Sequence, residues 1–80
     1  MKSTALNPSF EVDISNLLTP TSVNAVFQSI NTLTSGQVLK VTACSQNTVI
    51  AVVSFCKNSG NTLLQKDNID DEVTLFIKKN

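Results

Sequence analysis

The spacing of apolar residues switches repeatedly between two periods along this chain, which limits the folds open to it. Phe10, Val12 and Ile14 alternate with acidic residues, as in a half-buried strand. From Val23 to Leu33 the apolar residues recur every three or four positions, as on one face of a helix. The apolar period changes in the same way again after residue 36. The sequence therefore predicts strands at residues 10–14, 37–43, 62–66 and 73–78, and helices at residues 20–33 and 48–58.

The order strand, helix, strand, helix, strand, strand indicates an α/β protein of the α+β two-layer sandwich type. A strand-helix-strand unit closes right-handed with its strands parallel. Both helices must then bury their apolar stripes on one face of a mixed four-stranded sheet. A chain of 80 residues forms one domain. We expect a flexible lead-in at residues 1–9, which are polar and contain Pro8, followed by a single domain at residues 10–80.

Polar residues and glycines indicate where the helices begin and end. Thr19 is expected to be the N-cap of the first helix, with Pro20 at the first helical position. Residues 34–36 should end that helix. Residues 45–48 offer cap residues for the second helix, and residues 58–61 form a stop signal.

The composition argues against several classes of function. The chain has six lysines, no arginine, six acidic residues and a formal net charge of zero, and its four aromatic residues are all Phe. Binding to nucleic acid requires a basic stripe or stacking rings, so no nucleic acid partner is expected. No apolar run approaches the ~20 residues that span a bilayer, and none at the start resembles a signal peptide. We therefore expect a cytoplasmic protein with no membrane association.

The residues that usually carry catalysis or bind metals are scarce. Histidine is absent, which removes the commonest metal ligand and general base. The acidic group Asp67, Asp70, Asp71 and Glu72 lacks the alternating spacing and internal glycine of a calcium loop. We interpret it as a solvated hairpin turn. No glycine-rich phosphate loop is present. No metal and no cofactor are therefore expected.

Residues 13–23 read as the turn from the first strand into the first helix. They resemble the turn of the TusA (SirA-like) family of small sulfur-relay proteins, whose pattern is Asp-x-x-Gly-Leu-x-Cys-Pro-x-Pro-Val. The positions that match the pattern are Asp13, Leu17, Pro20 and Val23. The positions that differ are Asn16 for the glycine, Thr19 for the cysteine and Ser22 for the second proline. The resemblance extends from about residue 10 to residue 78.

This resemblance implies both a sheet topology and a chemistry. It implies the strand order 1-2-4-3, also seen in the C-terminal domain of translation initiation factor three. It further implies sulfur transfer with a protein partner, such as a cysteine desulfurase or a sulfur acceptor protein. In the family the motif cysteine carries a persulfide where helix N–H groups and the helix dipole stabilise an anion. Thr19 has no thiol, so the motif here is interpreted as degenerate.

The two cysteines receive different interpretations. Cys44 follows the second strand, and the carboxyl ends of parallel strands share one edge, so it is expected near the Thr19 turn. It is either a displaced reactive thiol or, as we favour, a small apolar residue that ends a buried strand. Cys56 shares the apolar face of the second helix and should lie in the core. A disulfide between them is not expected.

Three functions follow from these observations. The favoured one is a non-catalytic binding or regulatory module of a sulfur relay, with no confident catalytic residue. The second is an active sulfur carrier that uses Cys44. The third is an RNA-binding module, from the likeness to an initiation-factor domain, and the absence of arginine makes it distant.

Overall fold

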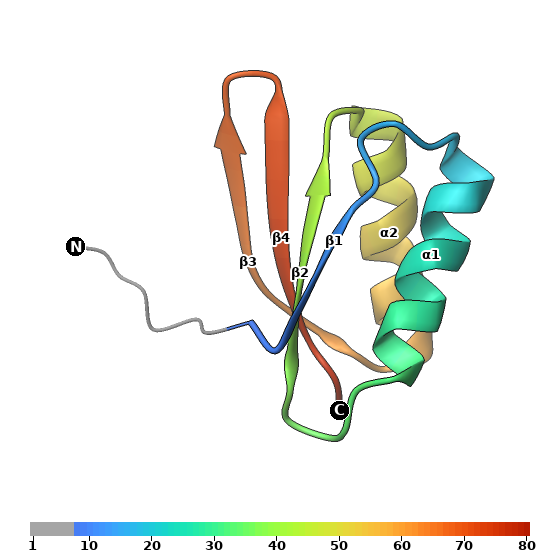
Figure 1. Cartoon of the computed structure of the whole chain (residues 1–80), viewed down its shortest axis with the longest axis vertical. Coiled ribbons are helices and arrows are strands. Elements are labelled where there is room, and N and C mark those ends of the chain that lie inside the picture. Colours follow the sequence, from blue (N-terminus) through green and yellow to red (C-terminus); the bar gives the residue numbers. More distant parts are fainter. Residues whose placement is uncertain (1–7) are drawn as a thin grey trace.

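The structure is a computed structural model that describes residues 8–80, and of Thr19 and Pro20 it describes the backbone (Figure 1). Most of the lead-in predicted at residues 1–9 lies outside the described residues. The elements are β1 (Phe10–Asp13), α1 (Thr19–Asn31), β2 (Val38–Ala43), α2 (Gln46–Ser59), β3 (Thr62–Ile69) and β4 (Glu72–Lys78). This is the predicted order of strands and helices.

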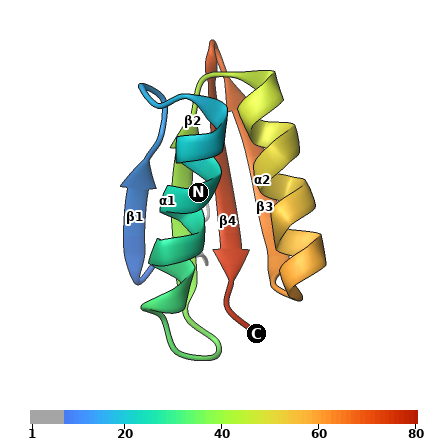
Figure 2. The ribbon, with the colours of Figure 1, turned by 90° about the vertical axis from the view of Figure 1, so that its right-hand side faces the viewer.

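The strands form one mixed sheet in the order β1-β2-β4-β3. β1 and β2 are parallel, whereas β4 is antiparallel to both β2 and β3. Both helices cover the same face of the sheet. Figure 1 shows the sheet and the helix layer side by side, and Figure 2 shows the molecule from the helix side. The predicted α+β two-layer sandwich and its strand order are thus confirmed.

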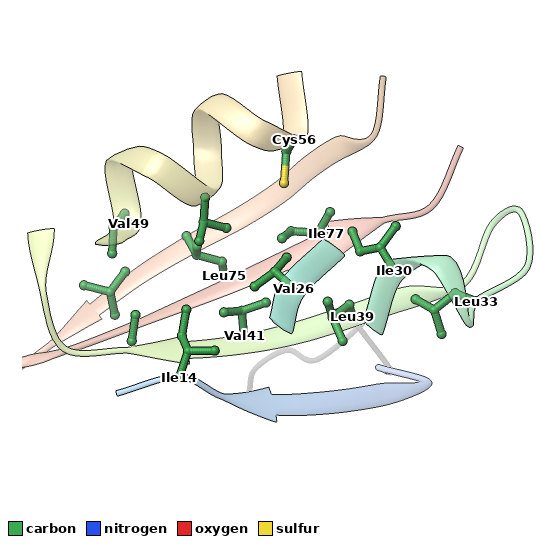
Figure 3. Close-up of a cluster of buried hydrophobic side chains, with 13 residues drawn as sticks. Ile14, Val26, Ile30, Leu33, Leu39, Val41, Val49, Cys56, Leu75 and Ile77 are labelled. Carbon is green, nitrogen blue, oxygen red and sulfur yellow. The ribbon is translucent and has the colours of Figure 1, made fainter. Parts of the chain in front are cut away.

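The core lies between the sheet and the two helices (Figure 3). Alternate residues of the two central strands point into it, and cross-strand partners such as Val41 and Leu75 are both fully buried. The helices contribute further buried side chains to the cluster, which are Val26, Ile30, Val49, Val52 and Cys56. Burial of each such aliphatic side chain contributes about 1.5–3 kcal/mol. This packing fixes both helices with their N-termini at the end of the sheet where β1 and β2 finish (Figure 1).

The helix ends agree with the prediction for α2 but not for α1. Ser45 is the N-cap of α2, and Gly60 ends that helix with a left-handed φ of 81°. The N-cap of α1 is Leu18, with an extended backbone, so the prediction that Thr19 is the N-cap is wrong. Thr19 is already the first helical residue. The error arose because proline is tolerated throughout the first helical turn, whose N–H groups have no acceptor within the helix.

The hairpin between β3 and β4 is tighter than predicted. β3 continues to Ile69 and β4 begins at Glu72, so the acidic turn consists of Asp70 and Asp71 alone. Asp70 adopts a φ of 56°, a left-handed conformation that aspartate tolerates better than most residues. Polar residues that usually indicate a loop are accommodated here in an exposed strand. Among the described residues no helix has the length and apolar character needed to span a membrane.

Candidate functional site

The turn between β1 and α1 is held by hydrogen bonds of its own side chains. The carboxylate of Asp13 accepts hydrogen bonds from the backbone N–H of Ser15, at 2.9 Å, and from the Ser15 hydroxyl. These two bonds, the hydroxyl bond first, lower the pKa of Asp13 below its usual value. Ile14, between them, is buried and its N–H donates to the carbonyl of Thr42 at 2.8 Å. The turn is therefore anchored to β2.

Ser22 is a buried polar residue that stabilises the same turn. Its hydroxyl donates to the carbonyl of Leu17 at 3.2 Å, and its N–H donates to the carbonyl of Leu18 at 2.8 Å. The side chain is fully buried. Proline at this position would have neither donor. In the sequence Ser22 is only a departure from the family pattern, and the two hydrogen bonds explain why serine suits this backbone.

The remaining motif positions lie at the surface of this turn and at the start of α1. Asn16, Leu17 and Leu18 are exposed, and Leu18 is 80% exposed. Thr19 and Pro20 are the first two residues of α1. Leu18 provides no side-chain acceptor for the first N–H groups of the helix. Two exposed leucines thus precede the start of α1.

Cys44 is exposed and contacts the β1–α1 turn. Its thiol donates to the carbonyl of Ser15 at 3.1 Å. The favoured interpretation of Cys44 as part of a buried strand end is therefore wrong. Ala43, the last residue of β2, is fully buried, and the next position along the chain is turned away from the core. The expectation that Cys44 lies near the turn is consistent with the contact to Ser15.

Cys56 lies in the core as predicted. It is 1% exposed, and burial raises the pKa of its thiol to about 11. Both cysteines are free. Of the two thiols, only that of Cys44 is placed to meet a second molecule.

A pocket of about 470 Å³ opens beside Cys44. Its lining residues come from the β1–α1 turn, the end of β2 and the β3–β4 hairpin, and they are Ser15, Asn16, Cys44, Ile69, Asp70, Asp71 and Glu72. The hairpin reaches this place because β4 is the neighbour of β2, with Val73 directly opposite Ala43. Three acidic residues therefore line the same pocket as the Cys44 thiol, and no lysine of the described chain lines it.

The hairpin was not among the residues predicted to form the site. The signal was present in the implied strand order, because 1-2-4-3 places the start of the fourth strand beside the end of the second. Within residues 8–80 there is no group of His, Cys, Asp or Glu side chains arranged to hold a metal ion. The arrangement offers an exposed thiol, exposed apolar side chains and an acidic rim.

Comparison with known protein families gives a match over residues 10–79 to the family described as sulfurtransferase TusA. The matched range contains the whole sheet, both helices and the β1–α1 turn. None of the curated proteins matches the chain.

Proposed function

This chain belongs to the TusA sulfurtransferase family, and from that premise we propose that it acts in the cytoplasm as a non-catalytic protein-binding module of a sulfur relay. Its partner is a cysteine desulfurase or a sulfur acceptor protein. The observation that carries the proposal is the acidic pocket at the motif turn. The pocket and the exposed leucines beside it suit contact with a protein better than storage of an anionic sulfur group.

Thr19 argues against sulfur transfer at the motif position. A hydroxyl cannot hold a sulfane sulfur, and the chain contains no histidine to activate it as a nucleophile. The start of α1 still has first-turn N–H groups of the kind that stabilise anions. In this proposal the backbone of the relay fold is retained while the residue that carries sulfur is not.

The charges around Cys44 also favour binding over sulfur transfer. Asp70, Asp71 and Glu72 line the pocket that Cys44 enters. A persulfide is an anion near neutral pH, and neighbouring carboxylates disfavour a further negative charge. The same carboxylates attract a positively charged surface of a partner and orient its approach.

The exposure of Cys44 supports a second candidate function, sulfur transfer through a displaced thiol. In that reaction the Cys44 thiolate attacks the outer sulfur of the donor's persulfide. A new S–S bond forms at Cys44, the donor's S–S bond breaks, and the donor leaves as a thiolate. Cys56 cannot take this role, since it is buried and its pKa is raised to about 11.

Sulfur loading by a cysteine desulfurase separates the two candidates. The chain is incubated with the desulfurase and cysteine, its intact mass is measured, and complex formation is followed by size-exclusion chromatography. We expect a complex with the desulfurase and no added sulfur. Loading that is lost in Cys44→Ser but kept in Cys56→Ser would establish the second candidate instead. Absence of both binding and loading would refute the second candidate with this donor and would exclude the desulfurase as the partner of the binding module.

A restored cysteine tests whether the turn is built for sulfur. In Thr19→Cys the new thiol lies at a helix N-terminus, which should lower its pKa below the ordinary ~8.5. The variant should therefore be alkylated faster than Cys44 near neutral pH and should accept sulfur where the wild type does not. Fast alkylation without loading would mean that the partner does not present its sulfur to this turn.

A further inference from the structure

β3 is an edge strand of the sheet. It pairs with β4 alone within the described part of the chain. None of its residues is buried, in contrast to β4, where every second residue is buried. An edge strand of this length presents unpaired backbone N–H and C=O groups, which are a template for a further strand.

An apolar groove lies between this strand and the helix layer. α2 packs alongside β3 (Figure 2), and the groove between them has a volume of about 280 Å³. Its lining residues are Val49, Ile50, Val53, Ser54, Lys57 and Lys66. Ile50 is 65% exposed although it neighbours the buried Val49. The groove therefore has an apolar wall on which Ile50 is exposed.

The groove carries positive charge only. Lys57 comes from the last turn of α2 and Lys66 from β3, and both are exposed. The side-chain ammonium groups of Lys57 and Lys66 make no hydrogen bond or ion pair with any residue in the range 8–80. The acidic hairpin residues Asp70 and Asp71 belong to the pocket beside Cys44 and do not line this groove.

We propose that this groove and edge bind an extended segment of a protein partner as a fifth strand beside β3. Main-chain hydrogen bonds to β3 would supply affinity, and alternate side chains would enter the groove and supply specificity. The apolar wall requires apolar side chains at some of these positions, and Lys57 and Lys66 require carboxylates at others. The partner segment is thus an extended one with apolar and acidic residues on its helix-facing side. This site is separate from the pocket beside Cys44 and does not depend on the proposed function.

A second copy of the chain fits the groove poorly. Cross-strand partners share a face of the sheet, so the helix-facing residues of β3 are those opposite buried residues of β4. They are Leu63, Lys66 and Asn68, which lie opposite Ile77, Leu75 and Val73. A second β3 would therefore bring a lysine rather than a carboxylate to Lys57 and Lys66.

The test uses a synthetic eight-residue peptide in which threonine alternates with valine and glutamate, so that one face presents Val and Glu in turn. Binding to the full chain is measured by fluorescence anisotropy, and the contacted residues by nitrogen-15 NMR. We expect backbone shifts in β3 and at Val49, Ile50 and Val53. A matched peptide with lysine for glutamate should bind at least about tenfold more weakly.

Two further comparisons separate strand addition from general charge attraction. The variant Lys57→Glu with Lys66→Glu should lose binding of the acidic peptide and gain binding of the lysine peptide. Its control, Lys40→Glu with Lys78→Glu, makes the same charge change at two lysines that do not line the groove and should bind normally. A peptide methylated on alternate backbone nitrogens, made in both registers, should bind weakly in at least one register because strand hydrogen bonds are removed.

Several results would overturn the proposal. Equal binding of the acidic and lysine peptides would remove the role of the two lysines. NMR shifts confined to surfaces other than β3 and α2 would place the ligand elsewhere. Undiminished binding of both methylated peptides would exclude strand addition. Self-association of the chain through β3, seen as concentration-dependent shifts without peptide, would identify a second copy as the occupant.

Discussion

The two turns that lead from a parallel strand into a helix are built differently. In the turn before α2, the Ser45 side chain accepts a hydrogen bond from the backbone N–H of Thr48 at 3.5 Å. In the turn before α1, the N-cap is Leu18 and no side chain caps the helix from that position. The side chains of Asp13 and Ser22 instead form hydrogen bonds with the backbone of the loop itself.

This difference shows that polar residues at a helix start need not serve the helix. In the first turn they fix the conformation of the loop between strand and helix. The N-cap residue of α1, Leu18, has no polar side chain to accept a hydrogen bond from the helix. In the second turn one serine caps the helix and leaves the preceding residue, Cys44, to face solvent. Stability is expected to depend on loop hydrogen bonds in the first turn and on helix capping in the second.

The largest effect is expected for Ser22→Pro, which places the family's second proline in this chain. The change removes the N–H bond to Leu18 and the hydroxyl bond to Leu17, and the ring clashes with the Leu18 carbonyl. We expect a loss of about 3 kcal/mol in the free energy of unfolding, measured by urea titration. Ser22→Ala, the control, keeps the N–H bond and should lose only about 1 kcal/mol. Equal losses would mean that the backbone bond is unimportant.

The thiol that follows β2 should react far faster than the thiol in the core. For Cys56 the rise of the pKa from 9.0 to about 11 reduces the thiolate fraction about 100-fold at pH 8. Alkylation with iodoacetamide, mapped by mass spectrometry, should therefore label Cys44 and spare Cys56 in the native protein. Rapid labelling of the core thiol in Cys44→Ser would show that α2 opens readily.

The buried thiol of Cys56 should also make the stability of the fold depend on alkaline pH. The pKa of Cys56 is higher in the folded than in the unfolded chain, because burial disfavours the thiolate. Its contribution is therefore complete below the ordinary value of 9.0 and is lost as the pH rises toward about 11. Cys56→Val should show a smaller loss of stability over this interval in urea titrations. A loss as steep as that of the wild type would assign the pH dependence to other groups.

Substitutions at the two N-cap residues should change the free energy of unfolding in opposite directions. Leu18 is 80% exposed and has the extended backbone of an N-cap, so Leu18→Ser should gain about 0.5–1 kcal/mol from a new side-chain acceptor. Ser45→Ala should lose about 0.5–1 kcal/mol. Both are measured by urea unfolding at constant pH. A loss in Leu18→Ser would mean that the apolar side chain supports the turn by packing.

The smallest effect concerns the titration of Asp13. Its pKa is lowered by the Ser15 hydroxyl and then by the Ser15 N–H, so its contribution to stability is present above the ordinary value of 3.8 and is lost as the pH falls below it. NMR titration of the carboxyl carbon should give a pKa below 3.8, and Ser15→Ala should move it back toward that value. No change in Ser15→Ala would assign the shift to the backbone bond alone.

The fold was largely predictable because the apolar period changes at each element border. Strand order was not, since periodicity does not say which strands are neighbours, and it came from the family resemblance. The start of α1 was missed because Pro20 is compatible with more than one position in the first turn. The pocket was missed because the acidic residues were interpreted only as a solvated hairpin turn, although the implied strand order places the start of β4 beside the end of β2. The exposure of Cys44 was missed because β2 ends at the buried Ala43, one residue before Cys44.

The short strand β1 has a consequence for the order in which the molecule forms and opens. It contains four residues, and among residues 8–80 its sheet neighbour is β2 alone. Its residue Phe10 pairs with Leu39, which is far along the chain. The β3–β4 hairpin, in contrast, closes over two residues and can form early. β1 should dock late in folding and detach first in the native state, at a lower free energy than global unfolding. The wall of the Cys44 pocket that contains Ser15 would then open and close on its own, while the acidic hairpin opposite it remained in place.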